Sequence, residues 1–324
     1  MSLAKLKGPS VLITGAGGYI GRQVVVALSR KYQKDLAAIV ATDIREMSPQ
    51  ERQEGVDYLT LDIRSPELRD IMKKYHVDTV VHLAAIVTPG QKSDRQFEYS
   101  VDVLGAKNVL DASVGAGVRK LIITSSGAAY GYHHDNPDQL DEQDALRGNP
   151  EFAYSDHKRQ VEEMLAQYRD AHPGLKQLVF RPGTILGPTA DNQITALFDK
   201  PVILGLRGSG SPFVFIWDRD VVACILKGIW EDVTGIFNMA GDGVISMREI
   251  AALLGKPYIS LPVWLVQSAL FVLKKLGMTQ YGPEQVNFLR YRPVLSNDRL
   301  KWVFGYIPEK TSREAFESYL REKR

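Results

Sequence analysis

Two residues have the types and the spacing for acid–base chemistry at an alcohol or a carbonyl group. Tyr154 and Lys158 lie four residues apart in a segment with helical periodicity, so both side chains leave one face of the predicted helix. A free tyrosine has a pKa of about 10, which is too high for a base at neutral pH. Nearby positive charge favours the phenolate and lowers that pKa, so Tyr154 could exchange a proton with a substrate hydroxyl or carbonyl.

A serine could hold the substrate oxygen beside this pair. Ser126 follows the apolar segment KLIIT (residues 120–124), which is predicted to be a strand, and Ser125 is a neighbour with the same hydroxyl group. Open sheets of parallel strands bind ligands at the carboxyl ends of those strands. A tyrosine and a lysine at this spacing are common on exposed helices, so the interpretation depends on the elements that would position them.

A glycine-rich segment near the N-terminus has the form of a phosphate-binding loop. The sequence TGAGGYIG places Gly15, Gly18 and Gly21 between an apolar strand over residues 10–14 and a helix that begins near Tyr19. Glycine is needed where a turn requires positive φ, where the backbone meets a pyrophosphate and where helix and strand pack closely. The helix start offers free N–H groups and a positive dipole end to phosphates.

An acidic residue ends the next predicted strand. Asp43, in VATDI, is placed to bind the adenosine ribose hydroxyls, and its charge repels a 2′-phosphate. We therefore predict NAD as the cofactor and regard NADP as less favoured, with Arg45 close enough in sequence to reduce the preference. The loop lacks the Gly-Lys-Ser/Thr ending of a nucleoside-triphosphate site.

The pattern of the chain predicts an α/β fold, a doubly wound parallel-sheet Rossmann domain with a smaller, mostly helical substrate domain. Continuous Val/Ile/Leu strands alternate with helices over the first half. Glycine and proline are dense over residues 184–217, whereas residues 218–242 resemble a helix and a strand that return to the sheet. We predict that residues 1–183 plus about 218–242 bind NAD, and that about 184–217 plus 243–324 bind the substrate.

Composition excludes several classes of protein. Lys and Arg total 40 against 38 Asp and Glu, a net charge of +2, which predicts no nucleic-acid partner. The single cysteine, Cys224, excludes an intramolecular disulfide and a cysteine-rich metal site. His133 and His134 lack a third ligand at usable spacing, so no metal is expected. The N-terminus has no apolar run of signal-peptide length, which favours a cytoplasmic enzyme.

One apolar segment needs a separate explanation. Residues 259–277 are strongly apolar but shorter than a membrane span, and Gln267 and Ser268 interrupt them. We predict no membrane span there and interpret the segment as a buried or lid helix. Lys274 and Lys275 near its end leave surface contact with a membrane as an alternative.

These motifs together resemble the extended short-chain dehydrogenases/reductases, the family of NAD-dependent epimerases, dehydratases and 3β-hydroxysteroid-type dehydrogenases. The resemblance rests on the glycine spacing and on LDIRS, HLAA, TSSGAAYG and YSDHK, and it continues through RPGTILGP, FIWDRDVV and FNMAGDGVISMREI. It implies that Ser126, rather than Ser125, is catalytic with Tyr154 and Lys158, and that Lys158 also binds the nicotinamide ribose. It further implies a homodimer through helices over residues 94–114 and 152–172.

The resemblance also implies the contacts of the cofactor. Asp62 and Ile63 would flank the adenine, and residues 83–85 would line the nicotinamide side. The candidate cofactor-binding residues are Gly15, Gly18, Tyr19, Ile20, Gly21, Asp43, Asp62, Ile63, Leu83, Ala84, Ala85, Tyr154, Lys158, Pro182, Gly183 and Thr184.

Departures from the family pattern bear on the substrate. Enzymes of this family that act on nucleotide sugars carry an Asn where this chain has Thr184, and that Asn contacts the diphosphate-linked sugar. They also carry an Arg where this chain has Phe213, which can serve as a cationic partner of the diphosphate. Phe213 replaces a cationic partner with apolar surface, although it could equally be a core residue, while Arg207 and Arg292 remain as possible phosphate ligands. We take Ser126, Phe213 and Arg292 as candidate substrate-binding residues. Asp102 also replaces a family Asn, which puts a hydrogen bond near the cofactor in doubt.

The motifs and the departures from them are compatible with three functions. The departures favour a simple oxidoreductase that transfers a hydride between NAD and a hydroxyl or carbonyl of a rather apolar substrate. The alternative is a nucleotide-sugar epimerase or dehydratase with tightly bound NAD. A non-catalytic NAD-sensing protein is disfavoured, because Ser126, Tyr154 and Lys158 are all present.

Overall fold

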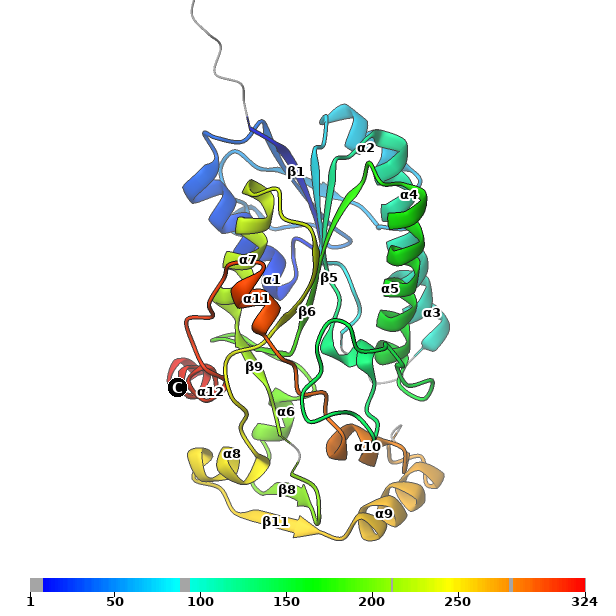
Figure 1. Cartoon of the computed structure of the whole chain (residues 1–324), viewed down its shortest axis with the longest axis vertical. Coiled ribbons are helices and arrows are strands. Elements are labelled where there is room, and N and C mark those ends of the chain that lie inside the picture. The colour runs from blue at the N-terminus through cyan, green and yellow to red at the C-terminus, as the bar shows by residue number, and fades with distance from the viewer. Residues whose placement is uncertain (1–7, 88–93, 211, 280–281, 324) are drawn as a thin grey trace, which may run out of the picture.

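A seven-stranded sheet runs through the centre of the molecule, in the order β10-β6-β5-β4-β1-β2-β3 (Figure 1). The computed structural model describes residues 8–87, 94–210, 212–279 and 282–323. Each neighbouring pair of strands in this sheet is parallel, which confirms the predicted fold class. The strands are β1 (Ser10–Thr14), β2 (Ala38–Asp43), β3 (Asp57–Thr60), β4 (Thr79–His82), β5 (Lys120–Thr124), β6 (Lys176–Pro182) and β10 (Gly235–Met239).

Helices cover both faces of this sheet (Figure 1). Alternate strand residues point to opposite faces, so Val11 and Ile13 of β1 join one apolar core and Leu12 joins the other. The first core contains residues of α1 (Tyr19–Ala27), α7 (Asp218–Trp230) and α11 (Asp298–Trp302). The second contains residues of α2 (Glu67–Lys74), α4 (Ala106–Ala116) and α5 (Ala153–Ala171). A short π-helical turn, η1 (Leu28–Tyr32), extends α1.

The helix predicted over residues 94–114 is present, and its middle is π-helical. It consists of α3 (Arg95–Tyr99), the π-helical segment η3 (Ser100–Gly105) and α4. The side chain of Asp94 caps its start by accepting hydrogen bonds from the backbone N–H groups of Gln96 and Phe97. π-Helical segments inside α-helices are frequent at functional sites, so the residues of η3 are candidates for a functional role.

The remaining elements form a smaller layer at the lower end of the molecule in Figure 1. Strand β7 (Thr184–Leu186) pairs with β9 (Phe215–Trp217), and β8 (Ile203–Leu206) pairs with β11 (Tyr258–Leu261). Phe213, Phe215 and Trp217 are buried in a third apolar core. The helices of this part are α6 (Thr195–Phe198), α8 (Met247–Leu254), α9 (Val263–Lys275), α10 (Gln285–Arg290) and α12 (Ser312–Lys323).

Residues 259–277 do not form one helix and are not buried, so the buried alternative of the predicted buried or lid helix is wrong. The segment divides at Pro262 into β11 and α9, because proline supplies no N–H to a strand but is tolerated before the first turn of a helix. No residue of α9 is buried. Among the described residues, no helix is both long enough and apolar enough to cross a membrane.

Candidate active site

A cavity of about 630 Å3 lies at the carboxyl ends of β1, β4, β5 and β6. Its walls come from the segments that follow these strands, which is where open parallel sheets bind ligands. Most of the candidate residues line it: Gly15, Gly18, Tyr19, Ile20, Gly21, Leu83, Ala85, Ser126, Tyr154, Lys158, Pro182, Gly183, Thr184, Phe213 and Arg292.

Four candidate residues do not line this cavity. The carboxylate of Asp62 accepts three hydrogen bonds from the Arg64 side chain, at 3.0, 3.1 and 2.6 Å, which lower the pKa of that carboxyl. Ile63 is buried beside Gly105, and Ala84 packs its backbone against Gly15. Asp43 accepts a hydrogen bond from the backbone of Gly17 in the glycine loop and does not line the cavity.

The glycine loop fits a pyrophosphate. Gly15 has a φ of +68°, and a Cβ there would lie 2.6 Å from the backbone nitrogen of Ala84. A Cβ on Gly21 would lie 2.1 Å from the carbonyl oxygen of Gly15. Helix α1 begins at Tyr19 with Gly18 as an N-cap that has no side chain, and its first turn has no acidic residue. The N–H groups of that turn are therefore available to an anion.

Asp43 is held against this loop. Its Oδ2 accepts a hydrogen bond from the backbone N–H of Gly17 at 2.9 Å, and its Oδ1 accepts one from that of Arg45 at 3.0 Å. The Arg45 side chain donates to the carbonyl of Gly17 at 2.7 Å. A carboxylate and a guanidinium thus stand side by side against the glycine loop.

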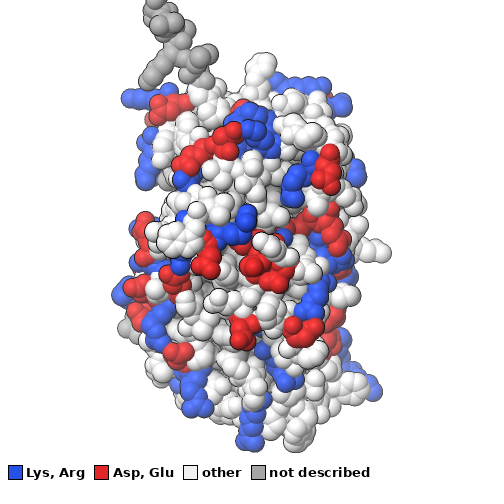
Figure 2. All heavy atoms as spheres, in the orientation of Figure 1, with Lys and Arg blue, Asp and Glu red and all other residues white. Residues whose placement is uncertain are grey.

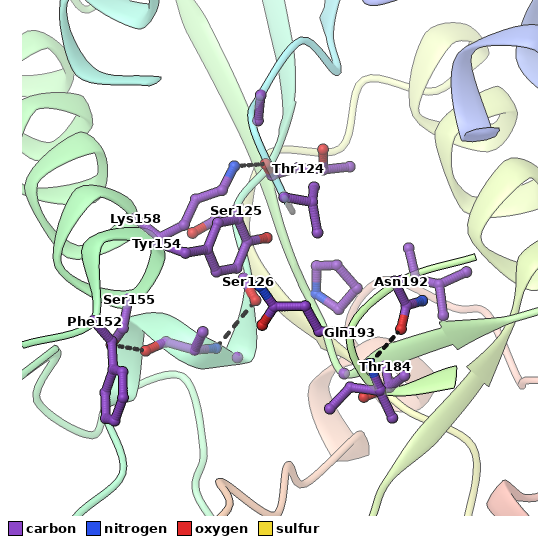
Figure 3. Close-up of a pocket in the computed structure, with 18 of the residues that line it drawn as sticks. Thr124, Ser125, Ser126, Phe152, Tyr154, Ser155, Lys158, Thr184, Asn192 and Gln193 are labelled. Carbon is purple, nitrogen blue, oxygen red and sulfur yellow. Dashed lines mark hydrogen bonds between the residues drawn. The ribbon is translucent and has the colours of Figure 1, made fainter. Parts of the chain in front are cut away.

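Ser126, Tyr154 and Lys158 face one another in the cavity (Figure 3). Tyr154 and Lys158 stand one turn apart at the start of α5, and the Lys158 Nζ lies 5.6 Å from the centre of the Tyr154 ring. That Nζ donates a hydrogen bond to the carbonyl of Thr124 at 3.0 Å, which ties α5 to the end of β5. Ser126 caps the 3-10 turn η4 (Gly127–Tyr130), accepting from the N–H of Ala128 at 3.1 Å.

Burial controls the ionisation of this group. It raises the pKa of Tyr154 to about 12, and the hydrogen bond with Ser126 opposes part of that rise. Burial also lowers the pKa of Lys158, against the attraction of Asp102 and Glu162. The expected lowering of the Tyr154 pKa is therefore not a property of the protein alone, because desolvation of the phenolate outweighs the hydrogen bond with Ser126.

A buried carboxylate and a buried histidine lie behind the Tyr154 and Lys158 end of α5, and sequence reasoning did not pair them. Asp102, in η3, accepts a hydrogen bond from the N–H of Ile86 at 2.8 Å, and its other oxygen lies 3.2 Å from Nδ1 of His157. Asp102 therefore does make a hydrogen bond to the segment that follows β4, despite replacing an Asn. No local motif indicates the contact between Asp102 and His157, because the two residues are 55 positions apart in the sequence.

Two aromatic rings hold an arginine at the opposite wall of the cavity. The guanidinium carbon of Arg292 lies 3.7 Å from the ring centre of Phe213 and 4.8 Å from that of Phe288. Phe213 itself is buried and stacks on Phe215 with ring centres 5.4 Å apart, so it serves both the core and the cavity. Nε and Nη2 of Arg292 are buried and have no hydrogen-bond partner within the described part of the chain. Phe288, from α10, was missed by sequence reasoning.

The loop histidines have local partners. His133 Nε2 lies 2.8 Å from the carbonyl oxygen of Gly148, and His134 lies 3.9 Å from a carboxylate oxygen of Asp135. Over residues 8–87, 94–210, 212–279 and 282–323, His, Cys, Asp and Glu form no group of three or more that could hold a metal ion. Cys224 is buried in α7.

Comparison with known proteins gives relatives over nearly the whole chain. A UDP-glucose 4-epimerase of Mycolicibacterium smegmatis is 26% identical over 321 residues, which covers 92% of this chain and 93% of that protein. An uncharacterized protein of Mycobacterium tuberculosis is 22% identical over 317 residues, covering 96% and 83%. The crystal structure of a Thermus thermophilus UDP-glucose 4-epimerase in complex with NAD has a TM-score of 0.73 at 22% identity, covering 97% and 99%.

A family model matches residues 11–228, about two thirds of the chain, and is described as the NAD dependent epimerase/dehydratase family. The matched region holds the glycine loop, Asp43 and the three residues Ser126, Tyr154 and Lys158. The description names NAD, in agreement with the cofactor predicted from the sequence. The chain belongs to the NAD-dependent epimerase/dehydratase family.

Proposed function

We propose that the protein transfers a hydride between NAD and a hydroxyl- or carbonyl-bearing carbon, with Ser126, Tyr154 and Lys158 as its catalytic residues. The observation that carries this proposal is that all three line the same cavity as the uncapped start of α1. A dinucleotide whose pyrophosphate lies at that helix start can extend along the cavity toward Tyr154.

Each residue has a role that its position supports. Ser126 holds the substrate oxygen by a hydrogen bond, and Tyr154 accepts the proton of that oxygen when the carbon loses its hydride, or returns it in reduction. Lys158, fixed by Thr124, binds the nicotinamide ribose and favours the phenolate. NAD⁺, when bound, supplies the hydride acceptor and a positive ring charge.

Arg292 favours a substrate with an anionic group. A buried guanidinium with unpaired nitrogens is costly unless an anion meets it, and a diphosphate accepts hydrogen bonds from such a group readily. Burial lowers the pKa of Arg292 to about 10, so it stays charged at neutral pH. The nucleotide-sugar epimerase or dehydratase alternative gains support from this residue, which stands beside the Phe213 that replaces the family Arg.

A simple oxidoreductase acting on a rather apolar substrate is the second candidate. The apolar residues that line the same cavity as Tyr154 include Ile86, Phe152, Val214, Phe288 and Leu295. A small number of polar groups in a mainly apolar pocket suits a hydrophobic alcohol or ketone as well.

One experiment separates the two candidates. First, the purified protein is denatured and the NAD that it releases is quantified. Second, the native protein is titrated with UDP-glucose and with a panel of apolar secondary alcohols, and NADH absorbance is followed in each titration. Stoichiometric NAD and micromolar UDP-glucose binding, weakened more than about tenfold by Arg292→Met, support the nucleotide-sugar function. Arg207→Met is the control, because Arg207 does not line the cavity. NADH formed only with the apolar alcohols supports the second candidate, and no NAD binding contradicts both.

The oligomeric state and the domain boundaries can be inferred in the same way. We propose a homodimer through α3–η3–α4 and α5, supported by the exposed side chains of Phe97 and Leu104 on the outer face of the first helix. We also propose that residues 1–183 with about 218–242 bind NAD and that the other segments bind substrate. A cytoplasmic location fits the need for NAD.

A further inference from the structure

Helix α9 turns an apolar face outward. None of its residues is buried, and the exposed fraction is 66% for Trp264, 50% for Phe271 and 67% for Leu276, which follows the helix. Residues 264–265, 268, 271–272 and 275–276 follow helical spacing, so they share one face. In an ordinary surface helix this face would be polar.

The neighbouring two-stranded sheet also exposes apolar side chains. Leu204 of β8 and Ile259 of β11 are register partners in a parallel pair, so they point to the same side, and they are 55% and 46% exposed. Strand β11 leads directly into α9, and both lie at the lower end of the molecule (Figure 1). We call the exposed residues of these elements the apolar end: Leu204, Ile259, Trp264, Leu265, Phe271, Val272, Leu276 and Met278.

The chain around the apolar end is basic. Residues 200–217 and 250–283 contain no Asp or Glu, and they contain Lys200, Arg207, Lys256, Lys274 and Lys275. In Figure 2 the lower tip of the molecule accordingly displays blue and white spheres and no red ones. Lys275 lies over the ring of Phe271 at 4.6 Å and has no carboxylate partner among the residues described, whereas Lys274 pairs with Glu284.

We propose that the apolar end docks on an anionic phospholipid bilayer, with α9 lying in the plane of the membrane surface. Contiguous exposed apolar surface marks interaction sites, and an interfacial helix buries its apolar residues at the level of the headgroups. Tryptophan is enriched at that depth, and lysines reach the anionic headgroups through their apolar stems. Thirteen residues are too few for α9 to span the bilayer.

The charge of the apolar end, as well as its apolar character, indicates a lipid surface as its partner. A second copy of this chain would bring the same basic residues against each other, whereas an anionic lipid surface neutralises them. The helices α3, η3, α4 and α5, through which we propose dimerisation, flank the sheet and leave α9 uncovered (Figure 1).

Docking would place the cavity near the membrane surface. Helix α10 follows α9, and Gln285 and Phe288 of α10 line the cavity. The ion pair of Lys274 with Glu284, at 3.0 Å, ties the two helices together.

Flotation with lipid vesicles tests the proposal. The NAD-loaded protein is mixed with vesicles of phosphatidylcholine alone or of phosphatidylcholine with phosphatidylglycerol, at low and high salt. We expect flotation with the anionic vesicles and its loss at high salt. Lys275→Gln should weaken binding about fivefold and Phe271→Ser at least as much. Trp302→Ser is the matched control, because Trp302 is 77% exposed but belongs to α11.

NAD affinity and circular dichroism show whether each variant is folded. The proposal is overturned if the wild type does not float with anionic vesicles at low salt, or if folded α9 variants float as well as the wild type. It is also overturned if the α9 variants instead lower the oligomeric state in sedimentation, which would identify a second copy as the occupant.

Discussion

At the scale of the residue, burial governs what the candidate catalytic groups can do. Tyr154, whose pKa burial raises to about 12, is protonated at neutral pH and suited to give a proton to a carbonyl that is being reduced. Oxidation of an alcohol needs the phenolate instead, so its rate should rise with pH. Positive charge from Lys158 and from the nicotinamide ring acts against the cost of burial.

Asp43 provides a prediction about cofactor choice. Replacing it with Ala removes a carboxylate that we place at the adenosine ribose, so NAD affinity should fall roughly tenfold while NADP affinity is unchanged or improved. Fluorescence titration with both cofactors measures the ratio. Asp57→Ala, at the exposed start of β3, is the control. An unchanged NAD-to-NADP preference would refute the ribose role of Asp43.

At the scale of the element, the π-helical segment η3 connects the loop after β4 with α5 through hydrogen bonds of one side chain. Its Asp102 contacts Ile86 on one side and His157 of α5 on the other. A π-helical turn contains one residue more than an α-helical turn, so side chains in η3 point in directions that α-helical spacing does not predict. The carboxylate of Asp102 is one of them.

Asp102→Asn should move the pH dependence of alcohol oxidation to lower pH. The negative charge of Asp102 raises the pKa of Tyr154, so its removal favours the phenolate. The pH–rate profiles of the variant and the wild type provide the measurement, with Asp111→Asn on the exposed surface of α4 as the control. An unshifted midpoint would contradict an electrostatic effect of Asp102 on Tyr154.

His82 makes β4 sensitive to acid. Its ring is buried and lies 2.7 Å from the Thr14 hydroxyl of β1, and burial lowers its pKa from 6.5 to about 3. Below pH 6.5 the unfolded chain binds a proton that the folded one does not bind until about pH 3. The free energy of unfolding should therefore fall with decreasing pH by up to about 1.4 kcal/mol per pH unit.

Denaturant unfolding across this pH range tests the role of His82. His82→Asn should remove most of this slope relative to the wild type. His134→Asn, at an exposed loop position, should retain it. Equal slopes in all three proteins would show that His82 is not the source.

At the scale of the whole molecule, the proposed homodimer leads to a direct prediction. Leu104 is 48% exposed on the outer face of η3, where we propose the dimer contact. Leu104→Glu should convert dimers into monomers in analytical ultracentrifugation, because a charge would be desolvated at the interface. Val303→Glu, at a position that is 58% exposed, should not. A wild type that is already monomeric would contradict the proposed dimer.

The sequence predicted the fold and the central motifs because these are encoded locally. Strand composition, the glycine spacing and the residues around Tyr154 each occupy a short segment, so their meaning does not depend on distant residues. The pairing of Asp102 with His157 and the stacking of Arg292 between Phe213 and Phe288 arise only when separate elements pack. The exposure of α9 was missed for the same reason, because an apolar sequence does not tell whether another element covers it.

The central claim is that Tyr154 exchanges a proton during hydride transfer while NAD is bound by other residues. The most direct test compares wild type and Tyr154→Phe in a single turnover, following NADH absorbance with UDP-glucose or with whichever alcohol the titration identifies. We expect the rate to fall by roughly a thousandfold, with NAD affinity changed little. A variant that turns over at the wild-type rate would contradict the assignment of Tyr154, and with it the proposed catalytic site.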